Sequence, residues 1–172
     1  DRNMLVTMHP TTLNEGNAEE EIDNTLKALA EYQDFGLIFT APNADPKNEL
    51  IFRKLNEFCA SCPNFSLHSS LGQQLYYSLL NIVDVVVGNS SSGILEAPSF
   101  SCVTVNIGDR QSGRIRSASV IDCDTSLEDI SLALKTALSD DMAQVAAQSP
   151  NLLGTAGASQ SIVRVLESLD LD

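Results

Sequence analysis

Residues 88–93, Gly-Asn-Ser-Ser-Ser-Gly, place small hydrogen-bonding residues directly after an apolar run. If a helix begins here, about four of its first backbone N–H groups have no partner within the helix. Small residues allow an anion to approach these groups, and serine hydroxyls add donors. A helix cap needs only one such serine, and the segment is not a Walker loop because no Gly-Lys-Ser/Thr follows. The pattern therefore predicts an anion-binding segment.

Glu96 follows Ser92 by four residues, which places both on the same face of a helix. A carboxylate does not point at phosphate, but it can accept two hydrogen bonds from a vicinal diol. A phosphate next to a ribose indicates a nucleotide. The alternative is structural: an acidic residue in the first turn stabilises a helix through its dipole by roughly 0.3–1 kcal/mol.

Two further groups have the right chemistry for a diphosphate site. Residues 106–114, Asn-Ile-Gly-Asp-Arg-Gln-Ser-Gly-Arg, carry Arg110 and Arg114, two of only ten basic residues. An arginine can bind a diphosphate through two parallel hydrogen bonds, although 23 acidic residues make a surface ion pair the simpler explanation. His9 precedes Pro10 at the end of an apolar run. A lone histidine is usually structural, but beside a diphosphate it can donate to phosphate or transfer a proton.

Short apolar segments alternate with segments of helical periodicity along the whole chain. We expect strands at residues 4–8, 36–40, 65–68, 82–87, 103–107 and 119–121. Helices are expected at residues 17–32, after Pro46 to about residue 59, and at residues 71–81, 126–138 and 159–169. Residues 140–159 are expected to be the least regular stretch. Strands that are apolar throughout predict a parallel sheet covered on both faces, hence a doubly wound, Rossmann-like α/β fold.

Ligands of such folds bind beyond the carboxyl ends of the strands. That rule selects His9, Asn43 and His68, together with residues 88–93 and 108–114. The agreement with the polar segments above is useful but partly automatic, because loops are polar in any case.

The composition indicates one globular domain over residues 1–172, and a net charge of −13 disfavours nucleic acid and anionic membrane surfaces as partners. The sequence contains no run of 18 apolar residues, so no membrane-spanning helix is expected. Residues 1–4 lack the layout of a signal peptide. Because the chain enters its first strand almost at once, we interpret it as a piece cut at a domain boundary.

Cys59 and Cys62 have C-x-x-C spacing, but no second pair of zinc ligands follows at a suitable distance. The motif lies near the end of a helix, whereas a redox motif needs a helix start, so we interpret it as structural. Cys102 and Cys123 are expected in the core. Reduced cysteines in such a chain indicate the cytoplasm, and neither a metal nor another cofactor is expected.

Two segments, residues 88–100 (GNSSSGILEAPSF) and 106–114 (NIGDRQSGR), resemble the C-terminal half of the UDP-N-acetylglucosamine 2-epimerases. Residues 6–12 (VTMHPTT), 42–45 (PNAD) and 152–166 (LLGTAGASQSIVRVL) are similar in the same order, although the last segment lacks the family's aspartate. The non-hydrolysing branch has His-Arg-Arg-Glu-Asn where this chain has His-Pro-Thr-Thr. The resemblance therefore favours the hydrolysing branch, which serves the synthesis of sialic-acid-type sugars.

The resemblance implies the second domain of a two-domain GT-B architecture that binds UDP-N-acetylglucosamine in its cleft. It places Ser90, Ser91 and Arg110 on the diphosphate, Glu96 on the ribose and Asn43 close to the nucleotide. His9 would lie near the diphosphate and the sugar as a catalytic residue.

The reaction implied by the resemblance eliminates UDP to give a 2-acetamidoglucal and then adds water with inversion at C2. Its proton-transferring carboxylates belong to the family's N-terminal half, which is absent here, and we expect the full-length protein to be a homo-oligomer. Two other functions stay open at this point. The chain could be the nucleotide-binding half of another GT-B glycosyltransferase, or a non-catalytic α/β interaction module.

Overall fold

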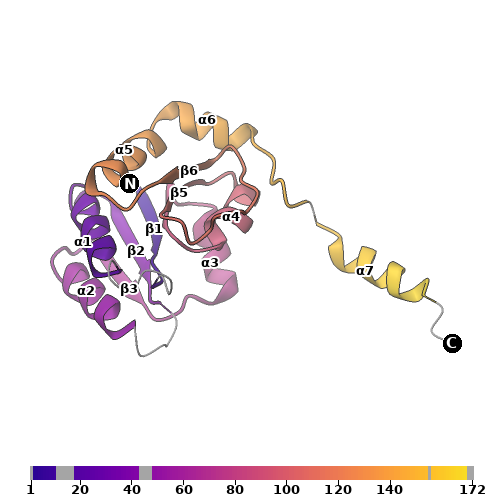
Figure 1. Cartoon of the computed structure of the whole chain (residues 1–172), viewed down its shortest axis with the longest axis horizontal. Coiled ribbons are helices and arrows are strands. Elements are labelled where there is room, and N and C mark those ends of the chain that lie inside the picture. The colour runs from indigo at the N-terminus through magenta and orange to yellow at the C-terminus, as the bar shows by residue number, and fades with distance from the viewer. Residues whose placement is uncertain (1, 11–17, 43–47, 155, 170–172) are drawn as a thin grey trace.

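A six-stranded, fully parallel sheet forms the centre of the molecule (Figure 1). The computed structural model describes residues 2–10, 18–42, 48–154 and 156–169. The strand order is β3-β2-β1-β4-β5-β6. The strands are β1 (Asn3–Thr7), β2 (Gly36–Thr40), β3 (Phe65–His68), β4 (Val85–Gly88), β5 (Val103–Ile107) and β6 (Val120–Cys123). This arrangement confirms the predicted doubly wound α/β fold.

Helices cover both faces of the sheet, which explains why its central strands are apolar throughout. One face packs against α1 (Ala18–Leu29), α2 (Glu49–Cys59), α5 (Leu127–Ala137) and α6 (Asp140–Gln148). The other packs against α3 (Gly72–Leu80) and η2 (Ala97–Phe100), with α4 (Ser92–Leu95) beside them. Figure 1 shows the two groups on opposite sides of the strands.

The stretch expected to be least regular contains a helix. In α6 the side chain of Ser139 accepts a hydrogen bond from the backbone N–H of Met142, and Asp140 and Asp141 occupy the first turn. A serine cap followed by acidic residues is a strong start signal, since both satisfy or complement the free N–H groups of the first turn. Ala146 is buried and attaches the helix to the core.

The last helix, α7 (Ala158–Glu167), projects away from the rest of the chain in Figure 1. None of its residues is buried. Its apolar residues recur at helical spacing, and Ile162, Val165 and Leu166 are each more than half exposed.

The chain adds strands first on one side of β1 and then on the other, so the strand order reverses at the pair β1 and β4. Strands β2 and β3 extend the sheet on one side of β1, and β4, β5 and β6 extend it on the other. In parallel sheets this switch point opens a crevice at the carboxyl ends of the two strands. His9, two residues after β1, and Asn89, the first residue after β4, therefore lie where a ligand is expected.

Gly88 permits the close approach of these two strand ends. Its φ is +131°, and a Cβ atom built on it would lie 2.0 Å from the carbonyl oxygen of Thr7. Only glycine fits such a conformation without strain and leaves room for the neighbouring backbone.

We predict that Gly88→Ala destabilises the protein more than Gly113→Ala. Gly113 also has a positive φ, +81°, but apart from its own residue and its two chain neighbours no described atom lies within 4 Å of the place that a Cβ on it would take. Its substitution should therefore cost only the backbone strain of about 1–2 kcal/mol. Denaturant unfolding measures both losses. Equal losses would show that Thr7 moves aside at no cost and that the close approach is not a constraint.

Candidate functional site

A cavity of about 500 Å³ opens at the carboxyl ends of β1 and β4. It contains three of the residues singled out from the sequence, His9, Ser90 and Glu96. The remaining lining residues come from β1, β2, the β3–α3 connection, α3 and α4: Thr7, Thr40, Ala41, Ser69, Ser70, Leu71, Gly72, Gln73, Tyr76, Tyr77 and Ser92. The cavity thus lies at the switch point of the sheet.

Residues 88–93, here called the serine segment, form a tight turn into a helix of only one turn. Helix α4 ends at Leu95 because Pro98, which has no N–H, begins a 3-10 helix with Ala97. Within the part of the chain that the structure describes, the backbone N–H groups of Ser90, Ser91 and Gly93 have no hydrogen-bond partner. A single turn has little macrodipole, so these N–H groups themselves are the donors available to an anion.

The two glycines of this segment have packing explanations, which corrects one part of the interpretation drawn from the sequence. Gly88 is required by Thr7. A Cβ on Gly93 would lie 2.6 Å from Cγ2 of Thr104, whose hydroxyl donates to the Gly93 carbonyl at 2.8 Å. The glycines therefore keep the turn close to the sheet, and they do not by themselves indicate a ligand.

Glu96 lies against the serine segment, as its spacing predicts. Its Oε2 accepts a hydrogen bond from the Ser92 hydroxyl at 2.5 Å, and its Oε1 lies 3.5 Å from the hydroxyl of Tyr77. Both partners line the same cavity. The carboxylate is half-buried and held in place at the cavity wall, with acceptor capacity left for a ligand hydroxyl.

His9 is held at the end of β1 by hydrogen bonds to its backbone. Its N–H donates to Oδ1 of Asn89 at 2.7 Å, and its carbonyl accepts from Nδ2 of Asn89 at 2.8 Å. Burial, and secondarily the positive charge of Arg110, lower the pKa of the His9 imidazole below its ordinary value of 6.5. The lowered pKa favours the neutral form of the ring at neutral pH.

Arg110 lies beside the cavity and is not part of its lining. Its Nη1 donates to the carbonyl oxygen of Asn89 at 3.0 Å, which leaves other guanidinium donors available. Ser91 is half-buried at the start of α4 and also lies outside the lining. Asn43 falls outside the described residues. His68, selected only by its position after β3, contacts Ser66 and does not line the cavity.

Several residues of the site carry little signal in the sequence. Tyr76 and Tyr77 are adjacent aromatic residues in a predicted helix, where core packing is the usual explanation. Asn89 stands out in the sequence only as part of the serine-rich segment, although its side chain makes the contacts that fix His9. A distinct polar pattern, Ser69-Ser70 after a strand, could have identified the β3–α3 connection.

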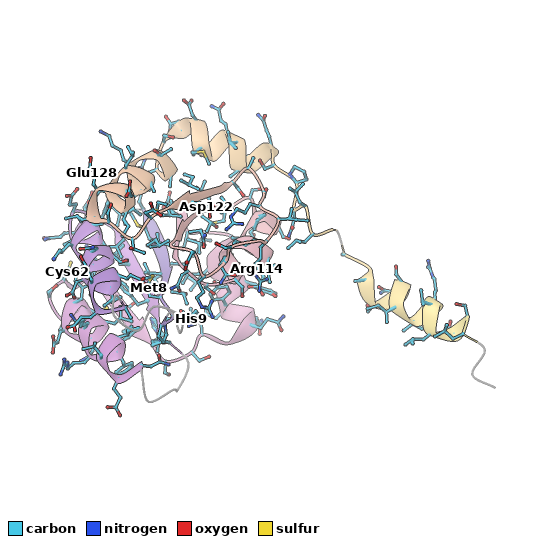
Figure 2. The ribbon with its side chains drawn as sticks, viewed as in Figure 1. Met8, His9, Cys62, Arg114, Asp122 and Glu128 are labelled. Atoms are coloured by element: carbon cyan, nitrogen blue, oxygen red, sulfur yellow. The ribbon has the colours of Figure 1, made fainter. Side chains whose placement is uncertain are left out.

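Other candidate chemistry in the chain has a structural explanation. The four cysteines are free, and burial raises the pKa of the Cys59 thiol to about 11, which makes it unreactive. Figure 2 shows Cys62 on the α1 and α2 side of the molecule, away from His9 and Arg114. Among the described residues, no cluster of three or more His, Cys, Asp or Glu side chains could hold a metal ion. The described helices include none that is long and apolar enough to cross a membrane.

A second groove of about 630 Å³ lies at the sheet edge, between β6, α5 and the loop after β5. Asp109, Asp122, Asp124 and Asp129 line it, with Arg116 as its one basic residue. Arg116 already pairs with Asp122 at 2.6 Å. The groove is larger than the cavity at the switch point, but its acidic lining is unsuited to a diphosphate.

The sequence profile of a family described as UDP-N-acetylglucosamine 2-epimerase matches residues 1–167. The chain belongs to this family. A hydrolysing GDP/UDP-N,N'-diacetylbacillosamine 2-epimerase of Campylobacter jejuni is 44% identical to it over 119 residues, which are 69% of this chain and 31% of that protein. A hydrolysing UDP-N,N'-diacetylbacillosamine 2-epimerase of Legionella pneumophila is 29% identical over 167 residues, 97% of this chain and 43% of that protein.

Solved structures of epimerases share the fold of this family member. The crystal structure of UDP-GlcNAc 2-epimerase from Neisseria meningitidis bound to UDP-GlcNAc matches with a TM-score of 0.81, over 98% of this chain and 45% of that one, at 17% identity. The predicted family and the predicted half of a GT-B architecture are thereby confirmed. The chain spans less than half the length of each of these three relatives.

We predict that the pKa of His9 in the ligand-free chain lies below 6.5. Arg110→Gln should raise this pKa part of the way toward 6.5. The recovery is partial because burial is the larger cause of the shift. NMR of the imidazole carbon-bound protons between about pH 4 and 8 measures both values. Arg114→Gln, in the same loop, serves as the control and should leave the pKa unchanged. A full return to 6.5 in Arg110→Gln would contradict the assigned burial.

Proposed function

We propose that this chain is the UDP-binding half of a hydrolysing UDP-N-acetylglucosamine 2-epimerase. The observation that carries the proposal is the convergence of His9, Ser90 and Glu96 on one cavity at the switch point of the sheet. Membership of the epimerase family and relatives named as hydrolysing enzymes support the reaction type.

The cavity offers a complementary group for each part of UDP. The diphosphate would accept hydrogen bonds from the N–H groups of Ser90 and Ser91, with the Arg110 guanidinium at its edge. Glu96 would accept from the two ribose hydroxyls. Tyr77 and the β3–α3 connection line the same cavity, and they would contact the uracil ring.

His9 would act next to the diphosphate. The negative charge of a bound UDP-sugar favours the imidazolium form, so the lowered pKa of His9 would rise on binding. The protonated ring would then donate to the departing UDP as the C1–O bond breaks. Elimination of UDP gives a 2-acetamidoglucal, and addition of water across its double bond gives the N-acetylmannosamine-type sugar. The groups that move the carbon-bound proton would come from the remainder of the protein.

Two other functions remain as alternatives to this proposal. A GT-B glycosyltransferase would use the same nucleotide cavity, and the relatives named as hydrolysing epimerases favour the epimerase over it. A non-catalytic interaction module needs no nucleotide, so a thermal-shift titration with UDP separates it from both enzymes.

We also propose a cytoplasmic location, which the four free cysteines support. Assembly of the full-length protein as a homo-oligomer stays a prediction.

We predict that Glu96→Ala lowers the affinity for UDP at least about tenfold. A hydrogen bond to a charged group contributes about 1.5–3 kcal/mol, and about 1.4 kcal/mol corresponds to a factor of ten. Isothermal titration of wild type and variant with UDP and with 2',3'-dideoxy-UDP gives a double-mutant cycle. The dideoxy ligand should bind both proteins about equally, because neither complex has the diol contact.

The matched control is Ser92→Ala, which removes one of the two hydroxyl partners of Glu96 and keeps the carboxylate. It should weaken UDP binding much less than Glu96→Ala. A coupling energy near zero between Glu96 and the ribose hydroxyls would show that Glu96 only supports its helix turn. In that outcome the nucleotide assignment of the cavity loses its main support.

A further inference from the structure

Asn89 is a buried residue that contacts residues of the site without lining the cavity. It follows Gly88 at the end of β4 and is only 1% exposed. Its backbone N–H donates to the Thr7 carbonyl at 3.2 Å. It does not line the cavity, so any effect it has on a ligand must be transmitted through residues that do.

The side chain of Asn89 continues the pairing of β1 with β4 by one step. The backbone ladder between these strands ends at the pair Thr7 and Gly88. Beyond it, Asn89 accepts from the N–H of His9 at 2.7 Å and donates to the carbonyl of His9 at 2.8 Å. A carboxamide holds an acceptor oxygen and a donor NH2 group in one plane, which matches the N–H and C=O of a peptide edge. These two bonds fix the backbone that carries the imidazole.

The backbone carbonyl of Asn89 holds a second element of the site. It accepts from Nη1 of Arg110 at 3.0 Å and from Nε2 of Gln111 at 2.9 Å. Both lone pairs of this oxygen are thereby used. One buried residue therefore connects the end of β1 to the loop that follows β5.

We propose that Asn89 is a positioning residue, which holds His9 and Arg110 together at the place where the diphosphate of UDP binds. This inference rests on the proposed function of the cavity. It requires asparagine at this position, because aspartate has no donor for the His9 carbonyl and leucine satisfies neither bond. Its role is indirect, since His9 and Arg110 make the contacts to the ligand.

The titration of His9 reports this positioning without any ligand. Burial and the charge of Arg110 lower the pKa of His9, and both depend on where its ring is held. The other titratable groups that share its cavity are Glu96, Tyr76 and Tyr77. A neutral substitution of Asn89 changes none of these charges, so a changed pKa would arise from a displaced ring.

The test uses Asn89→Ser, which is neutral and can keep one of the two bonds, and Asn89→Leu, which keeps the volume and removes both. The matched control is Asn24→Ser. The amide of Asn24 also donates to a backbone carbonyl, that of Thr125, but it joins α1 to the β6–α5 connection away from the cavity. Folding is checked by circular dichroism, UDP affinity by calorimetry and the pKa of His9 by NMR.

We expect Asn89→Ser to lose about tenfold in UDP affinity and to raise the pKa of His9 toward 6.5, while Asn24→Ser changes neither. In an Arg110→Ala background, substitution of Asn89 should cost less affinity than in wild type, because loss of its side-chain bonds to His9 also displaces the backbone carbonyl that binds Arg110. An unchanged His9 pKa in a folded Asn89→Ser protein overturns the proposal, as does an equal loss of affinity in Asn24→Ser.

If wild type itself does not bind UDP, the proposed function fails, and the His9 pKa still decides the role of Asn89. If Asn89→Leu does not fold, Asn89→Ser decides alone.

Discussion

The site depends on the contact between the backbones of Gly88 and Thr7. No side chain fits between them, because a Cβ on Gly88 would lie 2.0 Å from the Thr7 carbonyl oxygen. The contact sets β4 against the last residue of β1, so that Asn89, the first residue after β4, meets His9, the second residue after β1, just beyond the sheet. The position of the His9 imidazole and the start of the turn into α4 both depend on this contact.

The acidic chain gathers hydrogen-bond donors at this place. The net charge is −13, yet His9, Arg110 and the N–H groups of the serine segment all supply donors for an anion at one end of the sheet. The surrounding negative charge disfavours anionic partners in general, so the proposed nucleotide would have to be recognised through these local donors. The acidic groove at β6, which includes Asp109 of the loop after β5, offers the opposite chemistry.

The sequence predicted the order and type of almost all elements because apolar strands and amphipathic helices repeat their periods clearly. It missed α6, although Ser139 and the two aspartates after it form a recognisable start signal. The serine segment was identified by residue type, but its helix proved one turn long because Pro98 prevents its continuation. The role of Asn89 could not be predicted, since its partner His9 is 80 residues away in the chain. Spacing along one element reveals local pairs such as Ser92 and Glu96, whereas contacts between strand ends require the folded sheet.

The central claim is that UDP binds at the switch point between β1 and β4. Mapping backbone amide shifts during a titration of the chain with UDP tests it most directly, because two grooves of similar size compete within one molecule. We predict the largest shifts at Ser90, Ser92 and Gly93 and along the β3–α3 connection, with little change at Leu132 and Thr136 in the groove beside α5. Largest shifts at Leu132 and Thr136, or none anywhere at saturating UDP, would contradict it.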